Sequence, residues 1–415
     1  MLQNVTLSPS RRTLEFGIYR DGDNNLDRVQ SAVIDQAVAT SRADSRIEFT
    51  VEDTTSMRGG GGAPRQARGD TLHTDDFTIT DGSISHVATS RAHDMSDEQN
   101  LASFVARTLD NAEASGTKQT WIDLVDHGGG DGGGLQTSDG SCMSMPDIAK
   151  AISDGVAIHA LSHPEDAGRN VDGVVANQCL MDTMGFADAL SRAHVKWLAA
   201  SPETMLAPGT PTSVAHDIAA HESDPAAMAR AVVADVMHTT YGTGPFQEYR
   251  PAAAFDVLDL DGRKLAGAES AIRRFNDDAV TATHGNLALR AALRADIRST
   301  AGMTRFPGGK DLPWRADRPA LSVYDTIARD ERVAPQLRND AAAARDGIRA
   351  LVLAHRESRS FAPFGGSSYS DAAGPTMHFP TDRSQIDPWR NDGMSETNNA
   401  FYRDVHQGDF VRAVA

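Results

Sequence analysis

A histidine and a cysteine stand at corresponding places in this 415-residue sequence. His127 follows a strand-like segment, Thr120–Asp126, and three glycines come directly after it. Cys179 comes shortly after a second such segment, Val171–Ala176. Cysteine is the best side-chain nucleophile near neutral pH, because an appreciable fraction is thiolate, and histidine can take up or return the proton. These two residue types predict nucleophilic attack on a carbonyl carbon.

The backbone beside these residues suits the same chemistry. Gly128 lets the chain approach a carbonyl group without a Cβ in the way. A tetrahedral intermediate needs hydrogen-bond donors for its oxyanion, and backbone amides serve this purpose well. We therefore expect Cys179 to be the nucleophile and His127 the proton carrier, with the amides of Gly128 and Cys179 holding the oxyanion.

The elements that must position this pair are those of an α/β fold. Short β-branched or aromatic segments alternate with helical patterns over roughly the first 200 residues, which predicts a mainly parallel sheet flanked by helices. In such a sheet the carboxyl ends of the strands share one crevice, where reacting groups collect. His127 and Cys179 are thus expected to be neighbours in space although about 50 residues separate them, a gap close to that of caspases, whose cysteine signature differs.

The expected strands are Leu14–Tyr19, Ile47–Glu52, Thr120–Asp126, Val171–Ala176 and Val195–Ala200, with a hairpin formed by Phe77–Thr80 and Ile84–Ala88. The expected helices are Leu26–Thr40, Asp97–Asn111, Met145–Ser153 and Asp182–Arg192. After about residue 205 the pattern becomes mostly helical. Helices are expected there at Asp224–Thr239, Asp261–Thr281, Leu287–Ser299 and Pro335–Arg356, and strands at Ala253–Leu258 and near Thr376–Phe379.

Five blocks of residues together resemble a known family, the clostripain-like cysteine peptidases, which share a clan with caspases, legumain and gingipains. The blocks are Tyr19–Leu26 (YRDGDNNL), Asp126–Gly130 (DHGGG), Cys179–Met181 (CLM), Ser201–Glu203 (SPE) and Gly374–Pro380 (GPTMHFP). They span nearly the whole chain in the family's order. Each block alone is weak evidence for the family, whereas the five together are fairly specific for it.

The resemblance implies a fold and an activity. The fold would be a caspase-like catalytic domain over residues 1–250, with a helical C-terminal region over residues 251–415 that packs on it and returns a strand. The activity would be endopeptidase cleavage by a Cys–His dyad, after Arg or Lys, with activation by self-cleavage between the His and Cys segments. Lys150 and Arg169 lie in that interval, and Arg169 is the better candidate because it stands in a turn-rich loop.

The residue two positions before the nucleophile departs from the family. Clostripain-like peptidases usually carry an acid there, lining the pocket for a basic side chain, whereas this chain has Asn177. Losing a charge-assisted hydrogen bond typically costs about 1–3 kcal/mol. We expect Asn177, Glu203 and Thr204 to line the pocket. Either Glu203 or another acid such as Asp53 supplies the missing charge and a basic preference is retained, which we favour, or the preference is not strictly basic.

Composition limits the partners. There are 57 acidic and 40 basic residues, giving a formal net charge of −17. The resulting field repels nucleic acid and anionic membranes, so a protein or peptide substrate is expected instead. Two cysteines cannot build a disulfide framework, and no apolar stretch is long enough to cross a bilayer. The N-terminus lacks the apolar segment of a secretory signal, which favours a cytoplasmic location while leaving unconventional export open. The oligomeric state is not determined by the sequence.

Other readings of single features were weighed against these. Cys142 has no supporting segment and is interpreted as a bystander. His159 and His163 have the i, i+4 spacing of a zinc pair, but Ala160 stands where a zincin needs Glu, so no metal site is expected. Asp21–Asn25 resembles the start of a calcium loop and then departs from it, so a turn is expected. Calcium dependence is implied by the resemblance alone, without a site.

Two alternatives stay open. Met57–Gly69 contains four consecutive glycines and three arginines, and it is interpreted as a linker loop, or else as a protease-accessible regulatory loop. The whole chain could also be a non-catalytic binding or scaffold protein on the same fold. The intact His127 and Cys179 argue against the scaffold, and Asn177 keeps it in consideration.

Overall fold

A nine-stranded sheet forms the centre of the computed structural model, which describes residues 12–55, 72–206, 208–239, 254–300, 316–357, 374–386 and 399–415. The loop expected at Met57–Gly69 lies outside the described residues. The order across the sheet is β10-β8-β7-β6-β5-β1-β2-β3-β4. The strands are β1 Leu14–Asp21, β2 Ile47–Thr55, β3 His73–Thr80, β4 Ser83–Arg91, β5 Gln119–Val125, β6 Gly173–Asn177, β7 Trp197–Ala200, β8 Ala254–Asp259 and β10 Val352–Glu357.

The five central strands, β7, β6, β5, β1 and β2, are parallel, and the strands outside them pair antiparallel. Every residue of β1 and β6 is buried, as expected for strands covered on both faces. Because the central strands are parallel, their carboxyl ends meet at one edge of the sheet. The predicted mainly parallel α/β sheet flanked by helices is confirmed, including the Asp81-Gly82 hairpin between β3 and β4.

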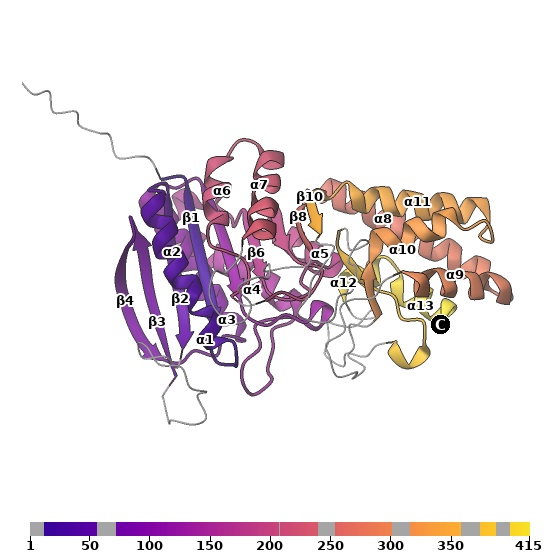
Figure 1. Cartoon of the computed structure of the whole chain (residues 1–415), viewed down its shortest axis with the longest axis horizontal. Coiled ribbons are helices and arrows are strands. Elements are labelled where there is room, and N and C mark those ends of the chain that lie inside the picture. Colours follow the sequence, from indigo (N-terminus) through magenta and orange to yellow (C-terminus); the bar gives the residue numbers. More distant parts are fainter. Residues whose placement is uncertain are drawn as a thin grey trace, which may run out of the picture.

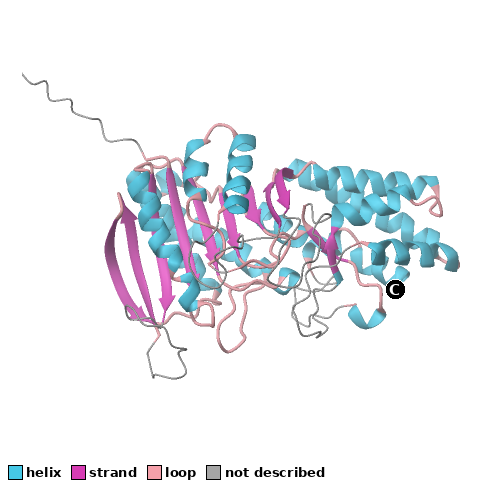
Figure 2. Cartoon of the chain, viewed as in Figure 1, coloured by secondary structure: helices cyan, strands magenta, loops and turns pink. Residues whose placement is uncertain are grey.

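Helices cover both faces of the sheet (Figures 1 and 2). Helices α3 Glu98–Ser115, α4 Met145–Ser162 and α5 Met184–Arg192 bury Phe104, Ile148 and Phe186 against one face. On the other face, apolar side chains come from α2 Ala32–Ala43, α6 Val214–Ala220 and α7 Pro225–His238, with the short α1 Asp27–Gln30 before them. Side-chain caps begin α3 at Asp97 and α4 at Ser144.

A second group of helices lies beside the sheet and carries its own apolar core (Figure 1). Rings of Phe275, Tyr324, Phe379 and Phe410 meet edge to face in this core. Its elements are α8 Gly262–Thr283, α9 Leu287–Ser299, α10 Ala320–Arg329, α11 Pro335–Arg349, α12 Ala400–Asp404, α13 Gln407–Val414, and the two-stranded sheet of β9 Asp317–Pro319 and β11 Thr376–His378. In the part of the chain that the structure describes, no helix is both long and apolar enough to span a membrane.

Two of the elements expected in the C-terminal half differ in the structure. The helix expected over Pro335–Arg356 ends at Arg349, and Val352–Glu357 forms strand β10, because β8 offers it an antiparallel partner that is distant in sequence. The strand expected near Thr376 exists as β11, but it pairs with β9 in a separate two-stranded sheet and meets the central region through a bridge to Thr183 and a hydrogen bond from the Thr376 amide to the Asp182 carbonyl oxygen at 2.9 Å. Since β8 and β10 come from beyond residue 250, the central sheet needs both halves of the chain, and the division into two domains at that residue stays a prediction.

Candidate active site

The register of β5 and β6 brings His127 and Cys179 to the same level of the sheet. Val125 pairs with Asn177 in this parallel ladder, and each is followed two residues later by His127 or Cys179. Neighbouring strands lie about 4.8 Å apart. The backbones that carry the imidazole and the thiol therefore leave the sheet side by side at its carboxyl edge.

The two loops stay in contact after they leave the sheet. A Cβ added to Gly128 would come within 2.2 Å of the Cys179 carbonyl oxygen and 3.0 Å of the Cys179 nitrogen. In addition, the Gln178 side-chain amide donates to the His127 carbonyl oxygen at 2.9 Å. Only glycine fits at position 128, because any side chain there would collide with the backbone of Cys179.

Cys179 is held as a neutral thiol. Burial raises its pKa to about 11, with smaller contributions from the charges of Asp126 and Glu203. The Met205 amide donates to Sγ at 3.3 Å, and this hydrogen bond lowers the pKa of the thiol. Leu180, directly after the cysteine, has a φ of +66°, a conformation that costs a branched residue energy and is common at functional turns. Its amide donates to the Glu203 carbonyl oxygen at 3.0 Å, which fixes this turn.

His127 is positioned by a residue that the sequence did not reveal. Its Nε2 lies 2.9 Å from Oδ1 of Asn25, in the turn after β1. The neighbouring Asn24 donates to Asp126 Oδ1 at 2.6 Å, so the residue before the histidine anchors the same turn. Burial lowers the pKa of His127, which favours the neutral imidazole. The expected turn at Asp21–Asn25 is confirmed, since Oδ1 of Asp21 accepts from the Asp23 amide at 2.7 Å.

Three of the expected pocket residues lie on segments next to Cys179, and the Asn177 side chain already has a partner. Asn177 is 2% exposed, and its carboxamide binds the Thr210 backbone twice, accepting at 2.7 Å and donating at 3.3 Å. Glu203 and Thr204 are also buried, in the segment that contacts the cysteine. The Thr204 hydroxyl makes no hydrogen bond to any described residue. Asn177 therefore holds the loop that contains Thr210 in place. The Glu203 charge acts on the Cys179 thiol.

Asp53 lies on β2, separated from β5 by β1. Its carboxylate pairs with the buried Arg20 guanidinium at 2.5 Å, and Asp27 pairs with the same guanidinium at 3.1 Å. Because Asp53 lies two strands away from β5 and its carboxylate is already paired with Arg20, it is poorly placed to supply the counter-charge missing at Asn177.

The glycine loop after His127 is fixed by the C-terminal half of the chain. The Tyr402 hydroxyl donates to Asp131 and accepts from the His378 amide at 3.0 Å. The His378 ring in turn lies 2.7 Å from Asp317, through Nδ1. These buried contacts tie the His127 loop to α12 and β11. Sequence reasoning missed them because no local pattern links residues so far apart.

Comparison with solved structures shows which known fold this chain shares. The chain superposes on iotapain, a secreted C11 cysteine protease of Bacteroides thetaiotaomicron, with a TM-score of 0.65 and 13% identity over 95% of this chain and 99% of that one. A secreted C11 protease from the same organism, in complex with an irreversible peptide inhibitor, superposes with a TM-score of 0.62 and 14% identity over 96% of this chain and 99% of that one. An inactive zymogen C11 protease of Parabacteroides distasonis gives 0.61 and 15%, with the same coverage. This chain has the C11 protease fold.

The C11, or clostripain-like, fold confirms at the level of architecture the resemblance drawn from the five sequence blocks, including the caspase-like sheet. No protein-family model and no curated protein sequence matches the chain. At 13–15% identity these likenesses establish the fold, so residue roles have to be argued from the site itself.

The remaining candidate residues lie in the segment that joins β5 and β6 of the C11 fold. Lys150 is on α4, as expected, and pairs with Glu98 and Asp154. Arg169 pairs with Asp166 in the loop before β6 and donates to the Thr117 carbonyl oxygen at 3.1 Å. Cys142 lies in the loop before α4, and its thiol points to the Gly132 carbonyl oxygen at 3.5 Å.

Proposed function

We propose that this chain is a cysteine endopeptidase in which Cys179 attacks the scissile carbonyl and His127 carries the proton. The observation that supports this most directly is the contact between Gly128 and the backbone of Cys179. It brings together, at one sheet edge, the two backbone segments that carry the thiol and the imidazole, and acyl transfer needs both groups.

The first step forms the acyl-enzyme. His127 takes the thiol proton as sulfur bonds to the carbonyl carbon, and the π electrons move to oxygen, held by the amides of Gly128 and Cys179. Because Nε2 faces Asn25, the nitrogen that exchanges the proton is Nδ1. Collapse of the intermediate breaks the C–N bond, and the amine leaves with the proton from His127. Water, deprotonated by His127, then releases the acid and restores the thiol.

The protonation states of Cys179 and His127 before substrate binds are compatible with these reaction steps. With the pKa of Cys179 raised to about 11 and that of His127 lowered, thiol and neutral imidazole coexist near pH 7. Ionisation is therefore coupled to attack rather than completed beforehand. Donation from the Met205 amide to Sγ stabilises the charge as it develops.

For the substrate, we propose a peptide with Arg or Lys before the scissile bond. Glu203 is the candidate counter-charge, because its charge acts on the Cys179 thiol and the segment around it contacts the cysteine. A peptide substrate is also consistent with the peptide inhibitor bound to the C11 protease of B. thetaiotaomicron. Activation by cleavage at Arg169 is part of the same proposal.

The direct test is covalent labelling. Purified protein is treated with an Arg-directed peptidyl chloromethyl ketone, and the adduct is located by peptide mass spectrometry. We expect one equivalent on Cys179, complete loss of labelling in Cys179→Ala, and unchanged labelling in Cys142→Ala. A folded protein that reacts with no member of a panel of peptide electrophiles is instead a binding or scaffold protein on this fold.

A further inference from the structure

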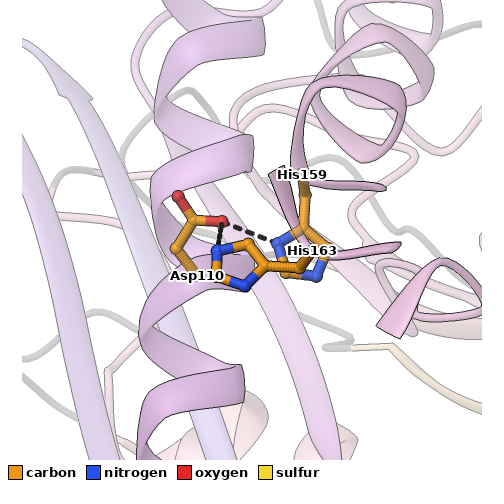
Figure 3. Close-up of side chains that lie close together, drawn as sticks. All are labelled: Asp110, His159 and His163. Atoms are coloured by element: carbon orange, nitrogen blue, oxygen red, sulfur yellow. Dashed lines mark hydrogen bonds and ion pairs between the residues drawn. The ribbon is translucent and has the colours of Figure 1, made fainter. Parts of the chain in front are cut away.

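A cluster of metal-ligand side chains lies away from Cys179, where α3 packs against α4 (Figure 3). Asp110 projects from α3, and His159 and His163 come from the last turn and the end of α4. One ligand atom from each of the three side chains lies within 4.8 Å of the other two. Two imidazoles and a carboxylate form the donor set that proteins use for zinc and related divalent metals.

The three side chains point at a common place. Oδ1 of Asp110 lies 2.6 Å from His159 Nδ1 and 3.4 Å from His163 Nε2. The two rings are nearly parallel, with centroids 4.9 Å apart and an interplanar angle of 20°. Ligand atoms bonded at about 2.0–2.1 Å to one tetrahedral ion are separated by about 3.3 Å. A small rotation of Asp110, which is partly exposed, would bring its oxygen to that spacing.

The second nitrogen of each imidazole faces a different carboxylate. His159 Nε2 lies 3.5 Å from Asp166 Oδ2, and His163 Nδ1 lies 3.6 Å from Glu113 Oε2. In metal sites the nitrogen that does not bind the ion almost always donates to a carboxylate or carbonyl, which fixes the ring orientation. Both histidines have such a carboxylate on the side away from Asp110.

Burial distinguishes this cluster from a solvated group of surface charges. The His159 side chain has no exposed surface, with Nδ1 facing Asp110 and Nε2 facing Asp166 at ion-pair distance. The side chains of Asp110 and His163 are 43% and 28% exposed, so an ion can reach the buried imidazole from solvent.

We propose that Asp110, His159 and His163 form a binding site for a divalent zinc-type cation, with Asp166 and Glu113 orienting the two imidazoles. His159 Nδ1, His163 Nε2 and an Asp110 oxygen are the protein ligands, and water completes the shell. The sequence argument against a metal site looked for a glutamate on the histidine helix. Here the carboxylate comes from another helix, so the spacing within α4 could not show it.

The position of the site indicates a structural role. His159 and His163 precede β6, at the amino edge of the sheet, whereas Cys179 follows β6 at the carboxyl edge. A bound ion would fasten the end of α4 to α3 and hold the turn of 3-10 helix η3 Pro164–Asp166, which leads to Arg169. This inference is independent of the proposed peptidase activity.

The test is zinc binding by the full chain carrying Cys179→Ala, which removes the thiol as a competing ligand. Chelator-treated protein is titrated with ZnCl₂ in a calorimeter, and thermal unfolding is followed with and without the ion. We expect one equivalent to bind and Tm to rise with zinc concentration. Asp110→Asn and His163→Ala should each weaken binding by at least about 10-fold, and Glu113→Gln by about 10-fold.

Matched controls separate ligation from misfolding. His284→Ala and Asp35→Asn remove exposed residues of the same types elsewhere and should bind zinc as the parent does. Asp110→Asn keeps an oxygen acceptor for His159, so its metal-free Tm should stay close to that of the parent. If the parent shows no saturable binding, or if both ligand variants bind like the controls, the cluster is a set of ion pairs and the proposal is wrong.

Discussion

Gly128 lies so close to Cys179 that a single added carbon would come within 2.2 Å of the cysteine carbonyl oxygen. Gly128, which follows His127, therefore packs directly against the backbone of Cys179, the candidate nucleophile. The same contact explains why glycine follows His127, and it makes the spacing of the two loops sensitive to one methyl group.

Gly128→Ala should remove activity and leave the fold intact. The added methyl must push the two loops apart, and a displacement of about 1 Å at a reacting centre can cost about 100-fold in rate. The measurement is kcat/KM on an Arg-containing fluorogenic peptide, together with Tm. Gly129→Ala is the matched control, because its Cβ would meet Gly133 O at an ordinary 3.6 Å and its φ of −131° suits alanine. Equal activity in the two variants would contradict the arrangement.

Asn25 should act as a positioning residue for His127. Asn25→Ala should lower kcat/KM by about 10-fold, because the imidazole loses the acceptor that orients it. Asn25→Asp should keep the orientation and raise the pKa of His127, because a nearby carboxylate favours the imidazolium. The acid limb of the pH–rate profile should then move to higher pH. A limb that stays in place would mean that the contact has only a structural role.

Alkylation of the Cys179 thiol by a small reagent that makes no use of the peptide-binding site should be fast only at alkaline pH. With its pKa raised to about 11, about one molecule in ten thousand carries the thiolate at pH 7. In a Cys142→Ser background, the rate of iodoacetamide alkylation should therefore rise about tenfold per pH unit from pH 7 to beyond pH 9. Glu203→Gln should shift this curve to lower pH, since it removes a charge that opposes ionisation. A plateau at neutral pH in the parent would show a preformed thiolate.

Glu203→Gln should also change specificity. If Glu203 balances the charge of a basic substrate, kcat/KM for Arg and Lys substrates should fall by about 10–100-fold relative to an uncharged side chain of similar length, corresponding to about 1–3 kcal/mol. A positional scan of peptide substrates with parent and variant measures this ratio. An unchanged ratio would assign the charge recognition to another residue.

Cleavage at Arg169 should be intermolecular. Arg169 lies before β6 and Cys179 after it, and the strand alone extends about 13 Å between them. The cut should therefore depend on protein concentration, and active enzyme should cleave the Cys179→Ala protein in trans. Arg169→Ala should stay a single chain on a denaturing gel, whereas Arg263→Ala should be processed normally. A cut in Arg169→Ala at the same rate would place processing elsewhere.

Local patterns in the sequence were enough to predict the central part of the fold. The buried segments around Ile122 and Val174 read as strands because parallel strands covered on both faces are apolar throughout. The same patterns predicted that His127 and Cys179 would leave neighbouring strands at one edge. Local patterns failed at β10, where a helix was expected through Arg356, because strand pairing with β8 overrides local preference.

What the sequence determined by itself was therefore the type of sheet and the two chemical groups at its edge. Tertiary structure alone decided that Gly128 meets the Cys179 backbone, that Asn25 faces the imidazole, that Arg20 pairs with Asp53, and that Asp110 meets His159 and His163. The physical reason is that strand and helix periods are encoded in neighbouring residues. Hydrogen bonds and ion pairs between distant side chains depend instead on how whole elements pack.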